Sequence, residues 1–400
     1  MGGITTVVAL VIAIAVHSAY KAYTAPLRTI SPYELFFSED YYQARHLFRE
    51  AARSANADLH VIPYPVDGMS DLSIDVAILR GSPTSLVIHL SGTHGVEGFA
   101  GSAIQSAYLS NKTTLTARRH AQTPTLVFVH AVNPYGFAKL RRYNEHNVDL
   151  NRNHLTPAEF DAVRARDPNH VGYVDIAPIL NPVVADDVSF WTKLAAHVLR
   201  YGYAAGKRAV VAGTYHDPRG LFYGGSELEP SHVLLGDFFT SSQHGLALDD
   251  VENVVLIDVH TGLGSRGDDS LMFNRPTVGR RIFPGQNVAN AEEAFSGYDS
   301  VAGYGVDGYA ATWFPKDTHV LTLTQEFGTV DGISVLRALR LENALFQYDP
   351  TARLAAAAHV RDVFYLHDDP HWKAQVASRG TGALHAVVAY LTADLKGPLN

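Results

Sequence analysis

Short runs rich in apolar residues recur along the chain and constrain its fold more than any other feature. They lie at residues 59–62, 74–79, 85–90, 125–130, 209–212, 254–258 and 320–324. Segments with helical periodicity separate them, beginning with residues 38–56, and helical patterns dominate after residue 333. Uninterrupted apolar strands alternating with helices are typical of a parallel sheet that is covered on both faces. We therefore predict an α/β fold with three α/β/α layers and a mixed, mainly parallel twisted sheet.

The composition is that of an ordinary globular protein. Of 400 residues, 46% are hydrophobic and 18% are charged, which excludes a disordered chain. The formal net charge is −8, so no basic surface indicates a nucleic-acid partner. Cysteine is absent, which excludes disulfides, thiol nucleophiles and cysteine-ligated zinc. No repeat or long linker interrupts the body of the chain, so we expect one domain over residues 30–396.

The beginning of the chain carries the only targeting signal in the sequence. Residues 1–20 are uncharged and largely apolar, and the first basic residue is Lys21. This length fits the hydrophobic region of a signal peptide, or a marginal membrane anchor. The positive charges that usually precede such a region are missing. We expect residues 1–22 to be a signal peptide or membrane anchor of an exported or membrane-attached protein, while a cytoplasmic location stays open.

The first chemically suggestive motif is residues 91–97, Ser-Gly-Thr-His-Gly-Val-Glu, directly after the predicted strand at 85–90. His94 and Glu97 are three positions apart, so one helical turn can direct both side chains at the same point. An imidazole nitrogen and a carboxylate oxygen are two of the three protein ligands that a catalytic zinc ion needs. The alternative is a helix cap with a solvated histidine and glutamate, and this motif alone does not decide.

Three further motifs lie near the ends of predicted strands, where α/β sheets place their sites. Residues 141–153 combine arginines, which suit bidentate carboxylate binding, with amide side chains and Asp149. His260 directly follows a buried strand, and Glu326 follows the last apolar strand, two positions ahead of a glycine. Each motif alone also fits a structural role: a solvated loop, a hydrogen-bonded strand-end histidine, or a buried glutamate paired with an arginine.

Taken together and in this order, the four motifs resemble the zinc carboxypeptidase family. That family has His-x-x-Glu, then an Arg and Asp-x-Asn-Arg, then a His after a strand, then a Glu on the last strand. The nearest resemblance is to an uncharacterised, mainly microbial branch that shares the Gly-Thr-His-Gly-Val-Glu-Gly-Phe-Ala-Gly and Val-Asp-Leu-Asn-Arg-Asn runs. It covers residues 31–391 and implies a zinc carboxypeptidase-like catalytic domain within residues 30–396.

The resemblance implies one zinc ion per chain. His94, Glu97 and His260 would bind it, and a catalytic site leaves the fourth position to water. Asp149 would orient the His94 ring from behind.

The resemblance also implies residues for chemistry and for substrate binding. Arg142, in preference to Arg141, would stabilise the oxyanion of the tetrahedral intermediate. Asn151 and Arg152 would bind a substrate carboxylate. Glu326 would be the general base that takes the proton of the zinc-bound water.

The mobile tyrosine of the family has two candidates here, Tyr304 and Tyr309, within a glycine-rich segment ahead of Glu326. Ordinary aromatic packing is the alternative for either. Residues 215–225 form a candidate substrate loop in which Phe222 and Tyr223 could flank a ligand, and structural packing explains them equally well.

The resemblance leaves three functions open. The first is a zinc exopeptidase of the metallocarboxypeptidase type, which cleaves an amide next to a free carboxylate. The second is an aspartoacylase-like zinc deacylase of N-acyl amino acids, so the expected partner is a peptide or an N-acyl amino acid. The third is a non-catalytic binding protein on the same scaffold. The motif order favours the first, and the retained Glu326 and ligands oppose the third.

Overall fold

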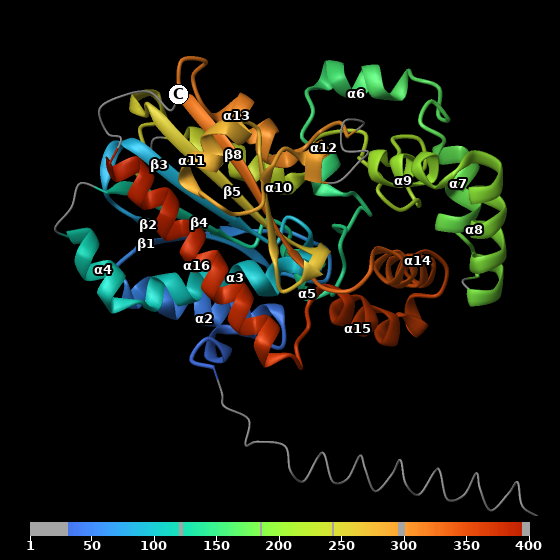
Figure 1. The fold of residues 1–400 in the computed structure, drawn as a ribbon, viewed down its shortest axis with the longest axis horizontal. Coiled ribbons are helices and arrows are strands. Elements are labelled where there is room, and N and C mark those ends of the chain that lie inside the picture. Colours follow the sequence, from blue (N-terminus) through green and yellow to red (C-terminus); the bar gives the residue numbers. More distant parts are fainter. Residues whose placement is uncertain (1–30, 120–122, 185, 242–243, 295–300, 394–400) are drawn as a thin grey trace, which may run out of the picture.

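The computed structural model describes residues 31–119, 123–184, 186–241, 244–294 and 301–393. Its centre is an eight-stranded sheet with the order β1-β2-β4-β3-β5-β8-β6-β7 (Figure 1). The strands are β1 (Asp58–Pro63), β2 (Ser73–Leu79), β3 (Ser82–Ser91), β4 (Pro124–His130), β5 (Asn253–Arg266), β6 (Asp269–Phe273), β7 (Val288–Ala289) and β8 (His319–Gly328). The central strands β4, β3, β5 and β8 are parallel, whereas β1, β2 and β6 pair antiparallel with their neighbours toward the centre of the sheet.

Helices cover both faces of this sheet, which confirms the predicted three-layer α/β/α fold. The longer helices are α2 (Tyr41–Ser54), α3 (Gly98–Ser110), α8 (Asp187–Tyr201), α9 (Tyr203–Ala212), α10 (Pro230–Thr240), α14 (Gly332–Tyr348), α15 (Arg353–Phe364) and α16 (Pro370–Ala393). The shorter ones are α4 (Lys112–Arg119), α5 (Pro134–Ala138), α6 (Pro157–Arg164), α7 (Tyr173–Leu180), α11 (Pro276–Ile282), α12 (Ala291–Ala294) and α13 (Gly305–Trp313). Single 3₁₀ turns are η1 (Glu34–Phe36), η2 (Gly95–Glu97), η3 (Leu150–Arg152), η5 (Leu248–Asp250) and η7 (Pro350–Ala352).

The alternation of side chains along the strands assigns each helix layer to a face. Gln105 Nε2 of α3 lies 3.2 Å from the side-chain atom His89 Nδ1, so α3 covers the face to which His89 points. Helix α16 packs on α3 and on the same central strands. On the opposite face, Thr322 of β8 donates to Asp307 of α13 at 2.8 Å, and α13 packs on α10. The apolar residues of β2 and β4 are buried along their whole length, as the uninterrupted pattern predicted.

A second group of helices lies at one end of the sheet. In Figure 1, α7, α8 and α9 form a cluster on the same side of the molecule as α14 and α15. The two sets share a hydrophobic core that is separate from the main one and includes Ile176, Phe190, Ala209, Leu339 and Phe364. This arrangement extends the molecule beyond the carboxyl ends of β5 and β8, where the candidate site lies.

The structure corrects three sequence predictions. Residues 209–212 are the last turn of α9 and not a strand, because a four-residue apolar run does not distinguish a strand from a buried helix end. The strands β6 and β7 were not predicted, since both are short. The helix predicted over residues 38–56 is α2, and its cap is Asp40 instead of Ser38, since Asp40 accepts from the backbone nitrogen of Gln43.

The predicted signal peptide or membrane anchor at residues 1–22 lies outside the described residues. Within the described ranges, the structure contains no helix with the length and apolar character needed to cross a membrane.

Candidate metal centre

The candidate ligands come from the carboxyl ends of two adjacent parallel strands. β3 ends at Ser91, and the following turn carries His94 and Glu97 at either end of η2. β5 pairs with β3 and carries His260 beyond the paired segment. All three side chains are buried, with residue exposures of 2–3%.

Close packing fixes the turn that holds the first two ligands. The backbone nitrogen of Gly95 donates to the oxygen of Arg142 at 3.2 Å, and that of Val96 donates to the oxygen of Arg141 at 2.8 Å. A Cβ atom on Gly95 would lie only 2.1 Å from the carbonyl carbon of Gly136, so no other residue fits there without displacing backbone. The loop that carries Arg142 is thereby tied to the turn that carries His94 and Glu97.

The three predicted ligands converge on one point. His94 Nδ1 lies 2.9 Å from Glu97 Oε1, and His260 Nδ1 lies 3.0 Å from Glu97 Oε2. The two Nδ1 atoms are 3.0 Å apart. Among the described residues, these three side chains form a group whose ligand atoms lie within 4.8 Å of one another, and the group could hold a metal ion.

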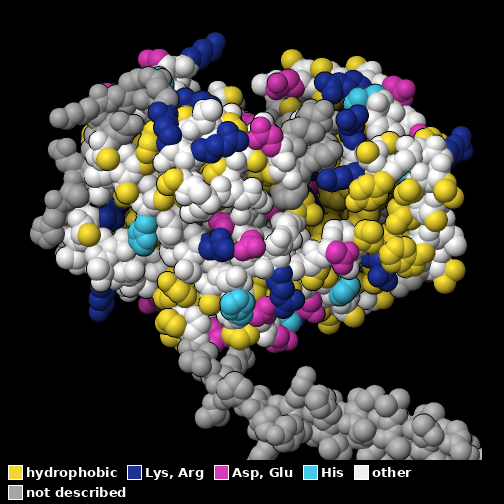
Figure 2. All heavy atoms as spheres, viewed as in Figure 1, with side chains coloured by type: hydrophobic (Ala, Val, Ile, Leu, Met, Phe, Trp, Pro, Cys, Tyr) yellow, Lys and Arg dark blue, Asp and Glu magenta, His cyan; other side chains and the backbone are white. Residues whose placement is uncertain are grey.

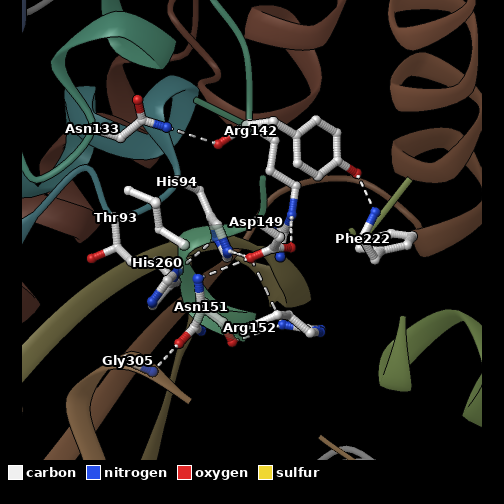
Figure 3. A network of polar contacts seen from close by, with 12 residues as sticks. Thr93, His94, Asn133, Arg142, Asp149, Asn151, Arg152, Phe222, His260 and Gly305 are labelled. Atoms are coloured by element: carbon white, nitrogen blue, oxygen red, sulfur yellow. Dashed lines mark hydrogen bonds and ion pairs between the residues drawn. The ribbon is translucent and has the colours of Figure 1, made fainter. Parts of the chain in front are cut away.

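A carboxylate supports each histidine from behind. Asp149 Oδ1 lies 3.0 Å from His94 Nε2 (Figure 3). Asp258 Oδ2 lies 3.0 Å from His260 Nε2. This leaves both Nδ1 atoms to face the common point, which is how metal-binding histidines are usually oriented. Asp258 was not singled out from the sequence, although Asp258 and His260 are two positions apart on a strand and therefore share a face.

The charges around the cluster favour a cation at its centre. Burial would lower the pKa of His260, but Asp258 and Glu97 beside it raise that pKa well above its usual value. Burial would raise the pKa of Glu97, but the adjacent His94 and His260 hold it below its usual range. The surroundings of His260 thus stabilise positive charge, and the carboxylate of Glu97 stays ionised.

Two neighbouring arginines have different surroundings, and only one faces the site. Arg142 Nη1 lies 3.1 Å from Glu97 Oε1, and its Nε lies 3.0 Å from Asp149 Oδ2. Arg141 is fully buried elsewhere, with its Nε 3.0 Å from Glu342 Oε1. Of the two candidates, Arg142 therefore lies beside the cluster and Arg141 does not.

Asn151 and Arg152 lie on η3, next to Asp149, and both are buried at the edge of the site (Figure 3). Arg152 Nε donates to the oxygen of Val211 at 3.0 Å, and Nη1 donates to the oxygen of Asn151 at 3.1 Å. These two bonds hold one side of the guanidinium group against backbone. Asn151 Oδ1 accepts from the backbone nitrogen of Gly305 at 2.8 Å, which fixes the direction of its amide.

Glu326 lies beside the cluster because of strand register. β5 and β8 are parallel, and His260 is paired with Glu326, so both side chains project from the same face of the sheet. The backbone nitrogen of Leu263 donates to Glu326 Oε1 at 2.9 Å. Burial, together with the negative charge of Glu97, raises the pKa of Glu326 to about 7.

A pocket of about 510 Å³ joins these groups. Besides the three ligands, its lining includes Arg142, Asn151, Arg152, Tyr304, Glu326 and Phe222 of the candidate substrate loop. The guanidinium carbons of Arg142 and Arg152 lie 5.5 and 6.0 Å from the Phe222 ring centroid, within range of a cation–π contact.

The two candidate tyrosines are placed differently. Tyr304 lines the pocket, and its hydroxyl lies 2.7 Å from Thr324 Oγ1. Tyr309 is fully buried, its hydroxyl lies 2.8 Å from His232 Nδ1, and its ring stacks on Trp313. The structure therefore does not bring Tyr309 to the metal cluster, because α13 directs this side chain into the core.

The fold and the site define an α/β protein with a buried His–Glu–His cluster at the carboxyl ends of its central strands. The family described as "Protein of unknown function (DUF2817)" matches residues 37–379, and the chain belongs to this family. Comparison with curated proteins finds no significant match. The predicted assignment to an uncharacterised branch is thus confirmed.

Several solved structures are similar to the chain. Carboxypeptidase A from Helicoverpa armigera is 14% identical, with 93% of this chain and 79% of that chain covered and a TM-score of 0.43. Bovine thrombin-activatable fibrinolysis inhibitor, solved with tick carboxypeptidase inhibitor, is 11% identical, with coverages of 89% and 99% and a TM-score of 0.43. Succinylglutamatedesuccinylase/aspartoacylase from Rhodobacter sphaeroides is 15% identical, with coverages of 73% and 64% and a TM-score of 0.29. The expected resemblance to carboxypeptidases is present among these structures.

Proposed function

We propose that the protein is a zinc-dependent hydrolase that cleaves an amide bond next to a free carboxylate. The observation that carries the proposal is the convergence of His94, Glu97 and His260 in a pocket that is also lined by Glu326 and Arg152. Two imidazoles and one carboxylate are a typical ligand set of catalytic zinc, and the two carboxylates behind the histidines complete it.

Zinc would be held by His94 Nδ1, His260 Nδ1 and Glu97, where it would polarise a carbonyl group and lower the pKa of water to about 7. Glu326 would take a proton from the attacking water and later deliver it to the leaving nitrogen. Arg142 would place positive charge beside the oxygen that becomes negative in the transition state. The role of Glu326 needs its carboxylate ionised, and the contacts of Arg142 with Glu97 and Asp149 hold the guanidinium group beside the cluster.

Arg152 and Asn151 would bind the free carboxylate of the substrate. Arg152 lines the pocket, while its Nε is held by backbone. Both the carboxypeptidase-like and the deacylase-like reaction have a carboxylate on the leaving-group side of the amide, so this site suits both. Tyr304, which lines the pocket, would contact the substrate near the carboxylate or the leaving group.

The proposal is tested by loading purified protein with zinc and assaying a mixed panel of peptides with free carboxyl termini and N-acyl amino acids. We expect hydrolysis that a chelator such as 1,10-phenanthroline abolishes and that added zinc restores. Hydrolysis that persists unchanged after complete removal of metal would contradict the proposal.

Replacing Arg152 by lysine tests the carboxylate site. Lysine keeps the charge but loses the planar fork, so one charge-assisted hydrogen bond or more is lost. We expect kcat/KM for substrates with a free carboxylate to fall by about 10- to 100-fold, the range for hydrogen bonds to charged groups. For amidated or esterified analogues, kcat/KM should fall much less in the same variant.

The matched control is Arg164→Lys, because Arg164 is an arginine of α6 that does not line the pocket. It should leave both substrate classes unaffected. Equal losses on free and amidated substrates in the Arg152 variant would remove Arg152 from this role.

A further inference from the structure

The pocket continues from the metal cluster into an apolar chamber between the two helix groups. Helices α8 and α9 form one wall of this apolar chamber, and α14 forms the other. Its wall residues are Leu194, Val198, Val210, Ile333, Leu336 and Leu339. They recur at helical spacing of three or four positions on α8 and α14, so each helix turns one continuous apolar face toward the space.

Other hydrophobic side chains lie on the outer surface of the helices that form the chamber. Figure 2 shows such side chains gathered over α7, α8 and α9 and beside a hollow on that side of the molecule. Several are exposed, including Val188 at 77% and Leu199 at 89% on α8. Helix α8 thus presents apolar side chains both to the chamber and to solvent.

Few groups in the chamber could bind a peptide backbone. The polar side chains that line its helical part are His197, Tyr203, Lys207 and Asp331. Asp331 already accepts from the backbone nitrogens of Ile333 and Ser334 at the start of α14. His197 Nε2 is buried without a partner in the described structure, and it faces Gly206, where an added Cβ would lie 3.1 Å away. A peptide group buried without a hydrogen-bond partner is disfavoured, whereas a hydrocarbon chain needs no partner.

We propose that the substrate is an N-acyl amino acid whose acyl group is a long hydrocarbon chain. This inference rests on the proposed function, since it uses the same metal cluster and carboxylate site. The amino-acid carboxylate would lie on Asn151 and Arg152, the amide beside Glu326, and the acyl chain in the apolar chamber.

The reaction is a hydrolysis that balances without a further reactant. The oxygen of water bonds to the carbonyl carbon, and the C–N bond breaks. The acyl chain leaves as a carboxylic acid, and the nitrogen takes a proton to leave as the amine of the free amino acid.

The first test varies only the chain length on the wild-type protein. Acetyl, hexanoyl and dodecanoyl derivatives of the same amino acid are compared, with peptides that have apolar carboxyl-terminal residues as the competing class. Burial of each added CH₂ group should raise kcat/KM by about fourfold until the chamber is filled. Equal kcat/KM along the series, or peptides as the better substrates, would overturn the inference.

A binding measurement separates this inference from the proposed hydrolysis. Calorimetry with the Glu326→Gln variant should show affinity for the intact N-acyl amino acids that increases with chain length. If no panel member is hydrolysed but affinity still increases with chain length, the proposed hydrolase function fails. The assignment of the acyl chain to the apolar chamber then stands. If hydrolysis occurs and affinity is independent of chain length, the chamber assignment fails alone.

Leu194→Trp tests the position of the chain. The larger side chain would fill part of the chamber, so the ratio of kcat/KM for dodecanoyl over acetyl substrates should fall at least about tenfold, because burial of two or more CH₂ groups would be lost. Val198→Trp is a second variant on the same face, in case the first does not fold. The matched control is Leu199→Trp on the exposed face of α8, and its ratio should equal that of the wild type. An equal fall in the Leu199 variant would overturn the assignment.

Discussion

Replacing Glu326 by glutamine is expected to give a folded protein that binds zinc and substrate but loses at least about 10²-fold in kcat, the lower range for acid–base catalysis. Glutamine has the size and shape of glutamate and can still accept the hydrogen bond from Leu263, but it cannot take a proton. The measurement is single-turnover hydrolysis together with the zinc content and the substrate affinity of the same preparation.

The pH dependence of kcat/KM is a second test of Glu326 as the general base. Burial and the charge of Glu97 raise the pKa of Glu326 to about 7, and a base acts only when it is deprotonated. kcat/KM should therefore fall as the pH is lowered through this pKa. A bound cation would stabilise the carboxylate and lower the pKa, so the acidic limb should lie below 7 in the zinc-loaded protein.

The control is Glu229→Gln, because Glu229 is a buried glutamate that contacts Asn144 and His146 and does not line the pocket. It should retain the activity and the acidic limb. A Glu326→Gln variant with bound zinc and a rate near that of the wild type would show that another group is the base.

The sequence predicted the part of the fold that depends on local pattern. Buried strands are rich in apolar residues along their length, so β2, β4 and the core of β5 and β8 could be located from the pattern of apolar residues. His94, Glu97 and His260 follow the predicted strands at 85–90 and 254–258, and the resemblance to zinc carboxypeptidases assigned them to the metal; in the structure His260 lies inside β5, which continues to Arg266. Their convergence could be expected because the carboxyl ends of adjacent parallel strands meet at the same edge of the sheet.

Other features depend on contacts that a linear pattern does not contain. The difference between Arg141 and Arg142 arises because one packs on Glu342 of α14 and the other on Glu97. Which of the two tyrosines near α13 faces the pocket is decided by the backbone of that helix and not by their similar sequence contexts. The apolar chamber needs α8 to approach α14, and a chamber-facing leucine has the same helical spacing as a core leucine. Asp258 is the exception, since it ends the predicted strand at 254–258 and lies two positions ahead of His260.

Replacing His94 or His260 by alanine is expected to remove most of the bound zinc and all of the zinc-dependent activity. Each variant deletes one of three protein ligands, and the two that remain do not complete a catalytic zinc site. The measurement is elemental analysis after dialysis against a fixed concentration of free zinc, with circular dichroism to establish that the variant is folded. His371→Ala is the matched control, because His371 is an exposed histidine at the start of α16.

Asp258→Asn should give an intermediate result that distinguishes a metal ligand from its support. The amide oxygen of this variant could still accept a hydrogen bond from His260 Nε2, but the negative charge that favours a cation at this position would be lost. The zinc affinity of Asp258→Asn should fall by about 10- to 100-fold, the usual range when such a supporting partner is lost. His260→Ala should bind zinc far more weakly than Asp258→Asn. The order expected for zinc affinity is therefore wild type, then Asp258→Asn, then His260→Ala. Full zinc content in both histidine variants would place the metal elsewhere and would contradict the site.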